Sequence, residues 1–97
     1  GAADCIGIYE NKETIIDFKQ SNKPKKDEWI DDYYLQCAAY SLAHNKVHSS
    51  NITQVVILLC TKDNIFQRFI VEGERLVNYQ KQFLEKVEQF YSQRMAN

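Results

Sequence analysis

The sequence contains few of the residues that interrupt regular structure, with 3 glycines and 1 proline in 97 residues. It also has almost no net charge, since 12 Lys+Arg stand against 13 Asp+Glu. Together with 44% hydrophobic residues, this composition excludes a collagenous repeat, a low-complexity linker and a disordered tail. A protein that coats nucleic acid should be strongly basic, so any DNA contact of this chain has to be a local patch.

Long apolar runs are missing as well. The longest one, Val55 to Cys60, is far shorter than the ~20 residues that a membrane-spanning helix needs. We therefore expect no membrane association.

Cysteine occurs only three times, as Cys5, Cys37 and Cys60, with wide spacing and apolar neighbours. No C-x-x-C pair is present, which leaves a zinc ribbon or an iron–sulfur cluster without a ligand framework. An odd number of such cysteines predicts buried, reduced thiols in an intracellular protein.

The hydrophobic pattern predicts one α/β domain over residues 1–97, an α+β arrangement around a mixed sheet with the order β-β-α-β-β-α. The expected elements are strands at 3–10 and 13–20, a helix at 28–44, strands at 53–61 and 65–71, and a helix from 73 to the end. The strand at 53–61 is apolar at successive positions, which is typical of a central strand covered on both faces. The last helix is expected to cover the sheet, with a coiled-coil partner helix as the alternative.

The first two predicted strands carry charged residues among apolar ones. Asp4 lies on the first strand, and Asp17 and Lys19 lie on the second. Because side chains alternate along a strand, Asp17 and Lys19 share one face and Phe18 points to the other.

The simplest hairpin joins these strands by a two-residue loop at positions 11–12, which places Glu10 opposite Glu13. In that register Asp4 lies directly opposite Lys19 and diagonal to the second aspartate, so three charged side chains meet on one patch. A three-residue loop would instead send Asp4 to the other face.

Two carboxylates that lie close together, with a backbone carbonyl nearby, form a hard oxygen site of the kind that Mg²⁺ or Mn²⁺ prefers. A lysine beside such a site can orient an attacking water and offset the charge of a phosphate. The alternative is a cross-strand ion pair of Asp4 and Lys19 near a sheet edge, worth less than about 1 kcal/mol. The hairpin alone leaves both interpretations open.

The helix at 28–44 carries polar side chains on a face of its own. Gln36 and Tyr40 are four residues apart, and Tyr33 lies near the same line. This line is offset by more than about 100° from the expected buried stripe. The expected stripe consists of Leu35, Ala38, Ala39 and Leu42. This polar face could contact a phosphate or a base, or it could be the half-exposed face of an amphipathic helix. Trp29, near the helix start, could stack on a base or could be a buried anchor of the helix.

Taken in order, these motifs resemble the PD-(D/E)XK nuclease superfamily and, within it, the RecB-like exonucleases. The matching segments are GAAD, IIDFKQS and LQCAAY, at residues 1–4, 15–21 and 35–40. The loop with lysines and a proline after D-x-K, followed by a helix with LQxxAY, looks most similar to the mitochondrial genome maintenance exonuclease and its phage relatives. The resemblance extends from Gly1 to about Ala43 and implies a restriction-endonuclease-like core.

The resemblance implies a metal-dependent DNA exonuclease that hydrolyses phosphodiester bonds with a metal-activated water in DNA processing, repair or recombination. Asp4 and Asp17 would bind Mg²⁺ or Mn²⁺ with the Phe18 carbonyl, and Lys19 would position the attacking water. By the same resemblance, the substrate-binding residues would be Tyr33, Gln36 and Tyr40 on the helix and Ser21, Lys23, Lys25 and Lys26 in the loop. The partner would be DNA, single-stranded or with free ends, in a bacterial or phage-infected cytoplasm or in a mitochondrion.

The sequence departs from the family pattern in two places. Relatives carry a helix upstream of the Gly-x-x-Asp strand, with a His or Glu that completes the metal site, and we expect this chain to be a fragment that lacks that helix and the strand before it. Gln20 stands where many relatives have Thr. The sheet edge left without its neighbouring strand would favour a dimer of the chain. Two alternatives stay open, a structure-specific endonuclease on the same fold and a non-catalytic DNA-binding or assembly module.

Overall fold

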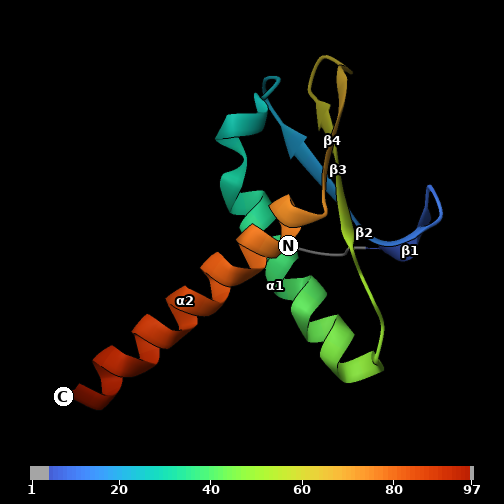
Figure 1. Ribbon diagram of the computed structural model, residues 1–97. Coiled ribbons are helices and arrows are strands. Elements are labelled where there is room, and N and C mark those ends of the chain that lie inside the picture. Colours follow the sequence, from blue (N-terminus) through green and yellow to red (C-terminus); the bar gives the residue numbers. More distant parts are fainter. Residues whose placement is uncertain (1–4, 97) are drawn as a thin grey trace.

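The computed structural model describes the backbone of residues 5–96 and the side chains of residues 6–94 (Figure 1). Its helices and strands follow the predicted order β-β-α-β-β-α, with one short 3-10 helix added. They are β1 (Cys5–Tyr9), β2 (Lys12–Ser21), η1 (Asp27–Trp29), α1 (Asp31–His48), β3 (Gln54–Thr61), β4 (Phe66–Glu72) and α2 (Glu74–Ala96). The predicted α+β class with a mixed sheet is confirmed.

The four strands form one sheet in the order β1-β2-β3-β4 (Figure 1). β2 and β3 run parallel, whereas the β1–β2 and β3–β4 pairs are antiparallel. A parallel pair needs a crossover connection, which η1 and α1 supply here. Asp17 lies beside Ile57 in this pair, and the carboxyl ends of both strands meet at Ser21 and Thr61.

The turn between β1 and β2 lies one residue earlier than the sequence predicted. Tyr9 pairs with Lys12, so the two-residue loop consists of Glu10 and Asn11. The predicted pairing of Glu10 with Glu13 is therefore wrong. Both loop residues have positive φ angles, 50° and 65°, as a type I′ turn requires.

Two local preferences account for this shift. Asn11 tolerates the left-handed backbone better than a lysine does. Lys12 instead enters the strand and pairs across the sheet with Glu72, at 2.5 Å. The predicted pairing of Asp4 with Lys19 falls outside the described residues.

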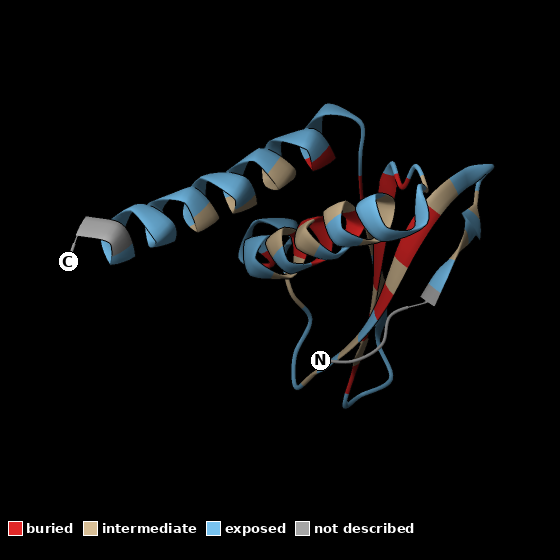
Figure 2. Cartoon of the chain, turned by 90° about the horizontal axis from the view of Figure 1, so that it is seen from below, coloured by how far each residue is buried: buried red, intermediate tan, exposed pale blue. Residues whose placement is uncertain are grey.

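Both helices lie on the same side of the sheet (Figure 2). The core fills the space between this sheet face, α1 and the first turn of α2. Its buried members are Ile15, Ile30, Tyr34, Cys37, Ala38, Ile52, Val55, Ile57, Val71 and Leu76. Each large apolar side chain buried here contributes about 1.5–3 kcal/mol through the hydrophobic effect.

The buried stripe of α1 is displaced by one residue from the predicted one. The buried positions are Tyr34, Cys37, Ala38 and Ser41. The predicted members that are only half-buried are Leu35, Ala39 and Leu42. Burial of the two hydroxyl groups is allowed because Tyr34 donates to Asp27 at 2.5 Å and Ser41 accepts from Gln80 at 2.9 Å. These partners come from η1 and α2, so periodicity within α1 could not reveal them.

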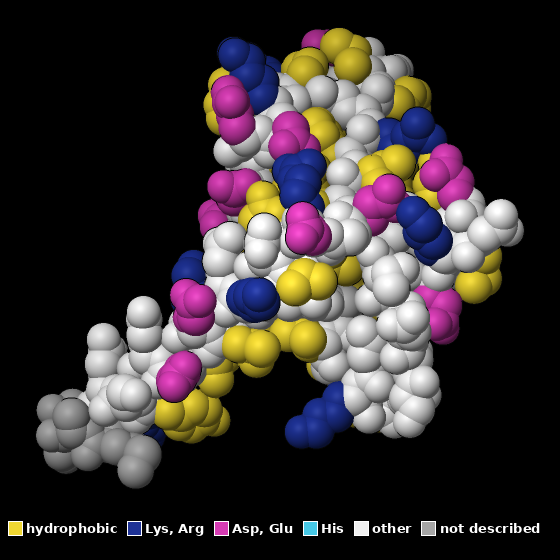
Figure 3. Space-filling view, viewed as in Figure 1, with side chains coloured by type: hydrophobic (Ala, Val, Ile, Leu, Met, Phe, Trp, Pro, Cys, Tyr) yellow, Lys and Arg dark blue, Asp and Glu magenta, His cyan; other side chains and the backbone are white. Residues whose placement is uncertain are grey.

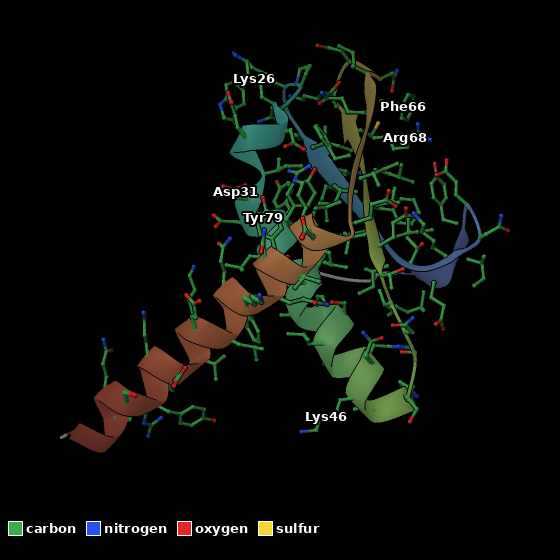
Figure 4. All side chains as sticks on the ribbon, in the orientation of Figure 1. Lys26, Asp31, Lys46, Phe66, Arg68 and Tyr79 are labelled. Atoms are coloured by element: carbon green, nitrogen blue, oxygen red, sulfur yellow. The ribbon has the colours of Figure 1, made fainter. Side chains whose placement is uncertain are left out.

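α2 packs on α1 near its start and then projects from the body (Figure 1). Leu76 is buried, and the Tyr79 hydroxyl donates to Asp31 at 2.7 Å (Figure 4). Further along, the exposed apolar residues are Leu84, Phe90 and Tyr91. Figure 3 shows hydrophobic side chains along this projecting part, so the prediction of a helix that covers the sheet is wrong for its second half. No described helix combines the length and hydrophobicity needed to cross a membrane.

The opposite face of the sheet has no helix over it in the described part of the chain (Figure 2). β3 is still an interior strand, as predicted, and its Gln54 and Val56 side chains are buried on this face. Tyr9 reaches over this face from β1, and its hydroxyl accepts a hydrogen bond from Arg68 of β4. Phe18 and Phe66 are exposed on it, at 58% and 77%. Cys60, predicted to be buried, is a half-buried free thiol.

Candidate active site

Asp17 and Lys19 form an ion pair on the helix-facing side of β2. Lys19 Nζ lies 3.2 Å from Asp17 Oδ2. The side chain of Asp17 is 3% exposed and that of Lys19 is 18% exposed. The two share a face because residues two apart on a strand point the same way. The pair therefore lies against the core and opens to solvent only through the ammonium group.

Burial of the Asp17 carboxylate carries a desolvation cost that an isolated charge could not overcome. Two donors offset this cost. One is the Lys19 ammonium, and the other is the thiol of Cys37 on α1, whose Sγ lies 3.6 Å from Oδ2. Both donors converge on Oδ2.

The surroundings of Lys19 hold it in its charged form. Burial by itself lowers the pKa of Lys19, but the hydrogen bond and the negative charge of Asp17 raise it, with further raising contributions from Cys37 and Tyr33. The net result is a pKa above the usual 10.5. Lys19 therefore remains a cation at physiological pH, suited to donate hydrogen bonds and offset negative charge, and unsuited to act as a general base.

α1 brings two of its predicted polar residues to this pair. Gln36 Oε1 accepts a hydrogen bond from Lys19 Nζ at 3.5 Å. The ring of Tyr33 lies under the same ammonium, 4.9 Å from Nζ to the ring centre, which is a cation–π contact. Tyr40 is 43% exposed and lies one turn further along α1 than Gln36. The structure thus gathers Gln36 and Tyr33 around Lys19, and leaves Tyr40 at the margin.

Cys37 belongs to the site, although sequence reasoning placed it only in the core. It is 1% exposed, as predicted for a buried thiol, and it donates to Asp17. Its spacing four residues after Tyr33 places it near that ring on the helix, but no pattern within α1 reveals the carboxylate opposite it. The same prediction of a buried thiol for Cys5 falls outside the described side chains.

The lysine loop begins where β2 ends and is held against β4. Gln67 accepts a hydrogen bond from the Lys25 backbone N–H and donates one to the Lys25 carbonyl, both at 2.8 Å. Ser21 Oγ donates to the carbonyl of Lys23 at 2.8 Å. These contacts fix the loop backbone, whereas the Lys23 and Lys25 ammonium groups form no ion pair with the carboxylates described in this chain. No sequence pattern identified Gln67.

Lys26 and Trp29 form a separate pair at the start of the helical layer. Lys26 Nζ lies 5.3 Å from the centre of the Trp29 ring. Trp29 is 60% exposed, so the expectation of a buried anchor is wrong and its ring is accessible for stacking. Figure 4 shows Lys26 at the opposite end of this layer from Lys46, which lies on the last turn of α1.

The structure describes only part of the predicted metal-ligand set. Asp17 offers a carboxylate, and Phe18 offers a backbone carbonyl while its side chain points to the opposite face. Asp4 lies outside the described residues. Among the residues the structure describes, no group of three or more His, Cys, Asp or Glu side chains could hold a metal ion. The oxygen donors of Asp17 and Phe18 fit Mg²⁺ or Mn²⁺ in kind, and completing a site requires ligands beyond them.

A comparison with models of known protein families and with curated proteins finds no match to this chain.

Proposed function

We propose that this chain is the core of a metal-dependent DNA exonuclease with a restriction-endonuclease-like arrangement of its sheet and helices. The observation that carries the proposal is the buried Asp17–Lys19 pair, faced by Gln36 from the crossover helix. An ion pair that served only stability would gain little from a position against the core, because desolvation offsets much of its attraction. A carboxylate, a fixed cation and an amide held together in this way are better explained by chemistry on a charged substrate.

The place of the pair in the sheet supports access by a substrate. β3 accompanies β2 to its carboxyl end, where Asp17 pairs with Ile57 and Ser21 with Thr61. Lys19 lies near this end, where the lysine loop begins, and its side chain is 18% exposed while that of Asp17 is buried. A substrate would therefore reach the pair through the ammonium group.

In the proposed mechanism Asp17 would hold the divalent ion, and the family resemblance implies Asp4 and the Phe18 carbonyl as further ligands. When bound, Mg²⁺ or Mn²⁺ supplies Lewis-acid stabilisation of the charge that develops at the phosphodiester. Lys19 donates hydrogen bonds to the attacking water and offsets the phosphate charge, because its ammonium is held in the charged form. Gln36 Oε1 accepts a hydrogen bond from the Lys19 ammonium and so orients it.

The substrate contacts we propose follow the charged and aromatic side chains around this centre. They are Tyr33 and Tyr40 on α1, with Ser21, Lys23, Lys25 and Lys26 in the loop that follows β2. Loop lysines without ion pairs suit the phosphate backbone, and exposed rings such as Trp29 suit unpaired bases. This combination favours single-stranded DNA or DNA with free ends.

A second candidate is a non-catalytic DNA-binding or assembly module on the same fold. The observation that favours it is the lysine loop, because the Lys23 and Lys25 ammonium groups form no ion pair with the described carboxylates and could bind a phosphate backbone without a metal. In that case the basic loop would bind DNA without cleaving it. A structure-specific endonuclease remains an outcome of the test below.

The test is digestion of DNA by the purified chain with Mg²⁺ or Mn²⁺. Single- and double-stranded DNA labelled at one end, and a covalently closed circle, are incubated with the parent chain and with Asp17→Asn. We expect stepwise release of nucleotides from ends, no nicking of the circle, and loss of release in Asp17→Asn and in EDTA. Lys46→Ala, on the last turn of α1, is the matched surface control and should cleave like the parent.

Each other outcome selects an alternative. Nicking of the circle identifies an endonuclease. DNA binding without cleavage of any substrate by the parent chain supports the non-catalytic module and overturns the exonuclease. Cleavage by Asp17→Asn at the parent rate contradicts the proposed centre.

A further inference from the structure

A polar cavity of about 530 Å³ lies at the carboxyl ends of the two parallel strands. Its lining includes the polar residues Ser21, Asn22, Lys25, Tyr33, Thr61 and Lys62. Tyr33 connects this cavity to the candidate active site, because the same ring contacts the Lys19 ammonium. The cavity and the Asp17–Lys19 pair are thus neighbours at one end of the sheet.

The backbone around this cavity is fixed by hydrogen bonds from several elements. The Lys62 N–H donates to the Ser21 carbonyl at 3.2 Å, which ties the ends of β2 and β3 together. In the turn after β3, Thr61 Oγ1 accepts from the Ile65 N–H at 3.1 Å. The Lys25 backbone is bound on both its N–H and its carbonyl by Gln67. The lysines therefore project from a pre-formed frame, so a ligand need not order the loops on binding.

The charge of this cavity is positive and uncompensated. Lys25 and Lys62 both line it, and neither ammonium pairs with a carboxylate among the residues that the structure describes. No acidic residue is part of its lining; Asp63 follows Lys62 in the turn and lies outside it. A cleft lined by charges of one sign concentrates ligands of the opposite sign.

The remaining polar groups suit an oxyanion and an attached ring. The Asn22 amide can donate a hydrogen bond, as can the Thr61 hydroxyl, whose oxygen already accepts from a backbone N–H. The Ser21 hydroxyl is occupied as a donor to Lys23 and contributes only an acceptor. Tyr33 adds an aromatic face at the side of the cavity nearer to Lys19.

We infer that this cavity binds a phosphate monoester, held by Lys25 and Lys62, with the attached nucleoside directed toward Tyr33. A monoester carries up to two negative charges near neutral pH, which two ammonium groups can match, whereas a phosphodiester carries one. Lys62 thereby becomes a binding residue that the sequence motifs do not include. The source of the monoester, a phosphorylated DNA terminus or a released mononucleotide, rests on the proposed function, whereas binding of the phosphate itself does not.

The test is a titration of the ¹⁵N-labelled chain followed by NMR in EDTA, so that no metal or cleavage is involved. The probes are thymidine 5′-monophosphate, thymidine 3′-monophosphate, inorganic phosphate, thymidine, and the diester thymidylyl-thymidine. Both monophosphates and inorganic phosphate should shift the amide signals of Ser21, Asn22, Lys25 and Lys62. Thymidine should not shift them, and the diester should bind more weakly than the monophosphates. Tighter binding of one monophosphate than the other identifies the terminus that the cavity accepts.

The matched variants are Lys62→Ala, Lys25→Ala and Lys46→Ala. Loss of one partly exposed charge contact should weaken monophosphate binding about fivefold for Lys62→Ala and for Lys25→Ala. Lys46→Ala should bind like the parent, and higher salt should weaken binding by the parent more than by Lys62→Ala.

Two results would overturn the inference: shifts of the same size with thymidine alone, or equal affinities of Lys62→Ala and Lys46→Ala. The proposed nuclease fails separately, because its test is cleavage and its variant is Asp17→Asn. If the chain binds monophosphates in EDTA but does not cleave DNA, the inferred phosphate site stands and the proposed nuclease function is refuted. If the chain cleaves DNA but Lys62→Ala binds monophosphates as tightly as the parent, the proposed nuclease function stands and the inferred phosphate site is refuted.

Discussion

Lys19 Nζ lies 3.2 Å from Asp17 Oδ2, between side chains two residues apart on one face of the central strand β2. The lysine bends back along its own strand toward a carboxylate that is almost fully buried. The crossover helix closes the arrangement, with Gln36 and Tyr33 against the ammonium and Cys37 against the carboxylate. The two charged residues of D-x-K thus form a cluster with three residues of α1, and this cluster reaches solvent through the Lys19 ammonium.

Replacing Lys19 separates its chemical contribution from its structural one. Lys19→Met keeps the aliphatic stem and leaves the Asp17 carboxylate with the Cys37 thiol as its remaining donor, so we expect a loss of about 1–3 kcal/mol in the free energy of unfolding. Cleavage should fall by at least about 100-fold, because the charge facing the phosphate is gone. Urea unfolding and cleavage assays check the two effects, with Lys46→Ala as control. Cleavage at the parent rate by folded Lys19→Met would contradict the proposed role.

The Cys37 thiol should matter through its contact with Asp17. Cys37→Ala removes the donor and leaves a small cavity, so it should cost about 1–2 kcal/mol of stability and weaken Mn²⁺ binding. Cys37→Ser keeps a donor and should bind Mn²⁺ more like the parent. Cys60→Ala, at a half-buried thiol on the opposite face, provides the comparison. If the Ala variants at both positions bind Mn²⁺ equally well, Cys37 has no positioning role.

Stability should decline in strongly alkaline solution, above pH 10. Burial, together with the hydrogen bond to Asp27, raises the pKa of Tyr34 well above its usual 10.0, and burial also raises the pKa of Tyr79. The unfolded chain therefore loses these protons first as the pH rises, so the contribution to stability is complete below pH 10 and falls above it. Urea unfolding between pH 8 and 11 should show this decline, and Tyr34→Phe should make it shallower. An unchanged slope in Tyr34→Phe, with exposed Tyr91→Phe as control, would refute this assignment.

The hairpin turn gives a prediction that is independent of function. Asn11 has a φ of 65°, where glycine is unstrained and a β-branched residue is disfavoured. Asn11→Gly should leave stability equal or raise it by up to about 0.5 kcal/mol, and Asn11→Val should lower it by more than about 1 kcal/mol. Thermal or urea unfolding of the two variants measures the difference. Equal stabilities of Asn11→Gly and Asn11→Val would contradict the left-handed backbone conformation of residue 11.

The order and type of the helices and strands could be predicted because they depend on local patterns. The alternation of side chains around Asp17 indicates a strand with one buried face, and the continuous apolar run of β3 indicates an interior strand. The hairpin register could not be read in the same way, because moving a turn by one position preserves the alternation on both strands. The deciding interactions, a left-handed Asn11 and a Lys12–Glu72 pair across the sheet, involve backbone geometry and a strand 60 residues away.

Part of the candidate site follows from sequence spacing, and part depends on tertiary packing. Asp17 and Lys19 share a face because of the strand period, and Gln36 reaches them because the crossover helix must pack over β2. Cys37 was assigned only to the core, since nothing in its own helix shows a carboxylate opposite it. Gln67 contacts the lysine loop from β4, and Lys62 lines a cavity formed by two strand ends. The roles of Gln67 and Lys62 can be recognised only once the strands are assembled into the sheet.

The proposed nuclease depends most on Asp17 as the ligand of a divalent ion beside Lys19. The direct measurement is paramagnetic broadening of the ¹⁵N-labelled chain by substoichiometric Mn²⁺, with Mg²⁺ as competitor. We predict selective loss of the amide signals of Asp17, Phe18 and Lys19, with recovery on addition of Mg²⁺. The same signals should persist in Asp17→Asn, which removes the carboxylate charge. Broadening elsewhere in the chain, or equal broadening of the parent and Asp17→Asn, would contradict the metal centre on which the proposed nuclease rests.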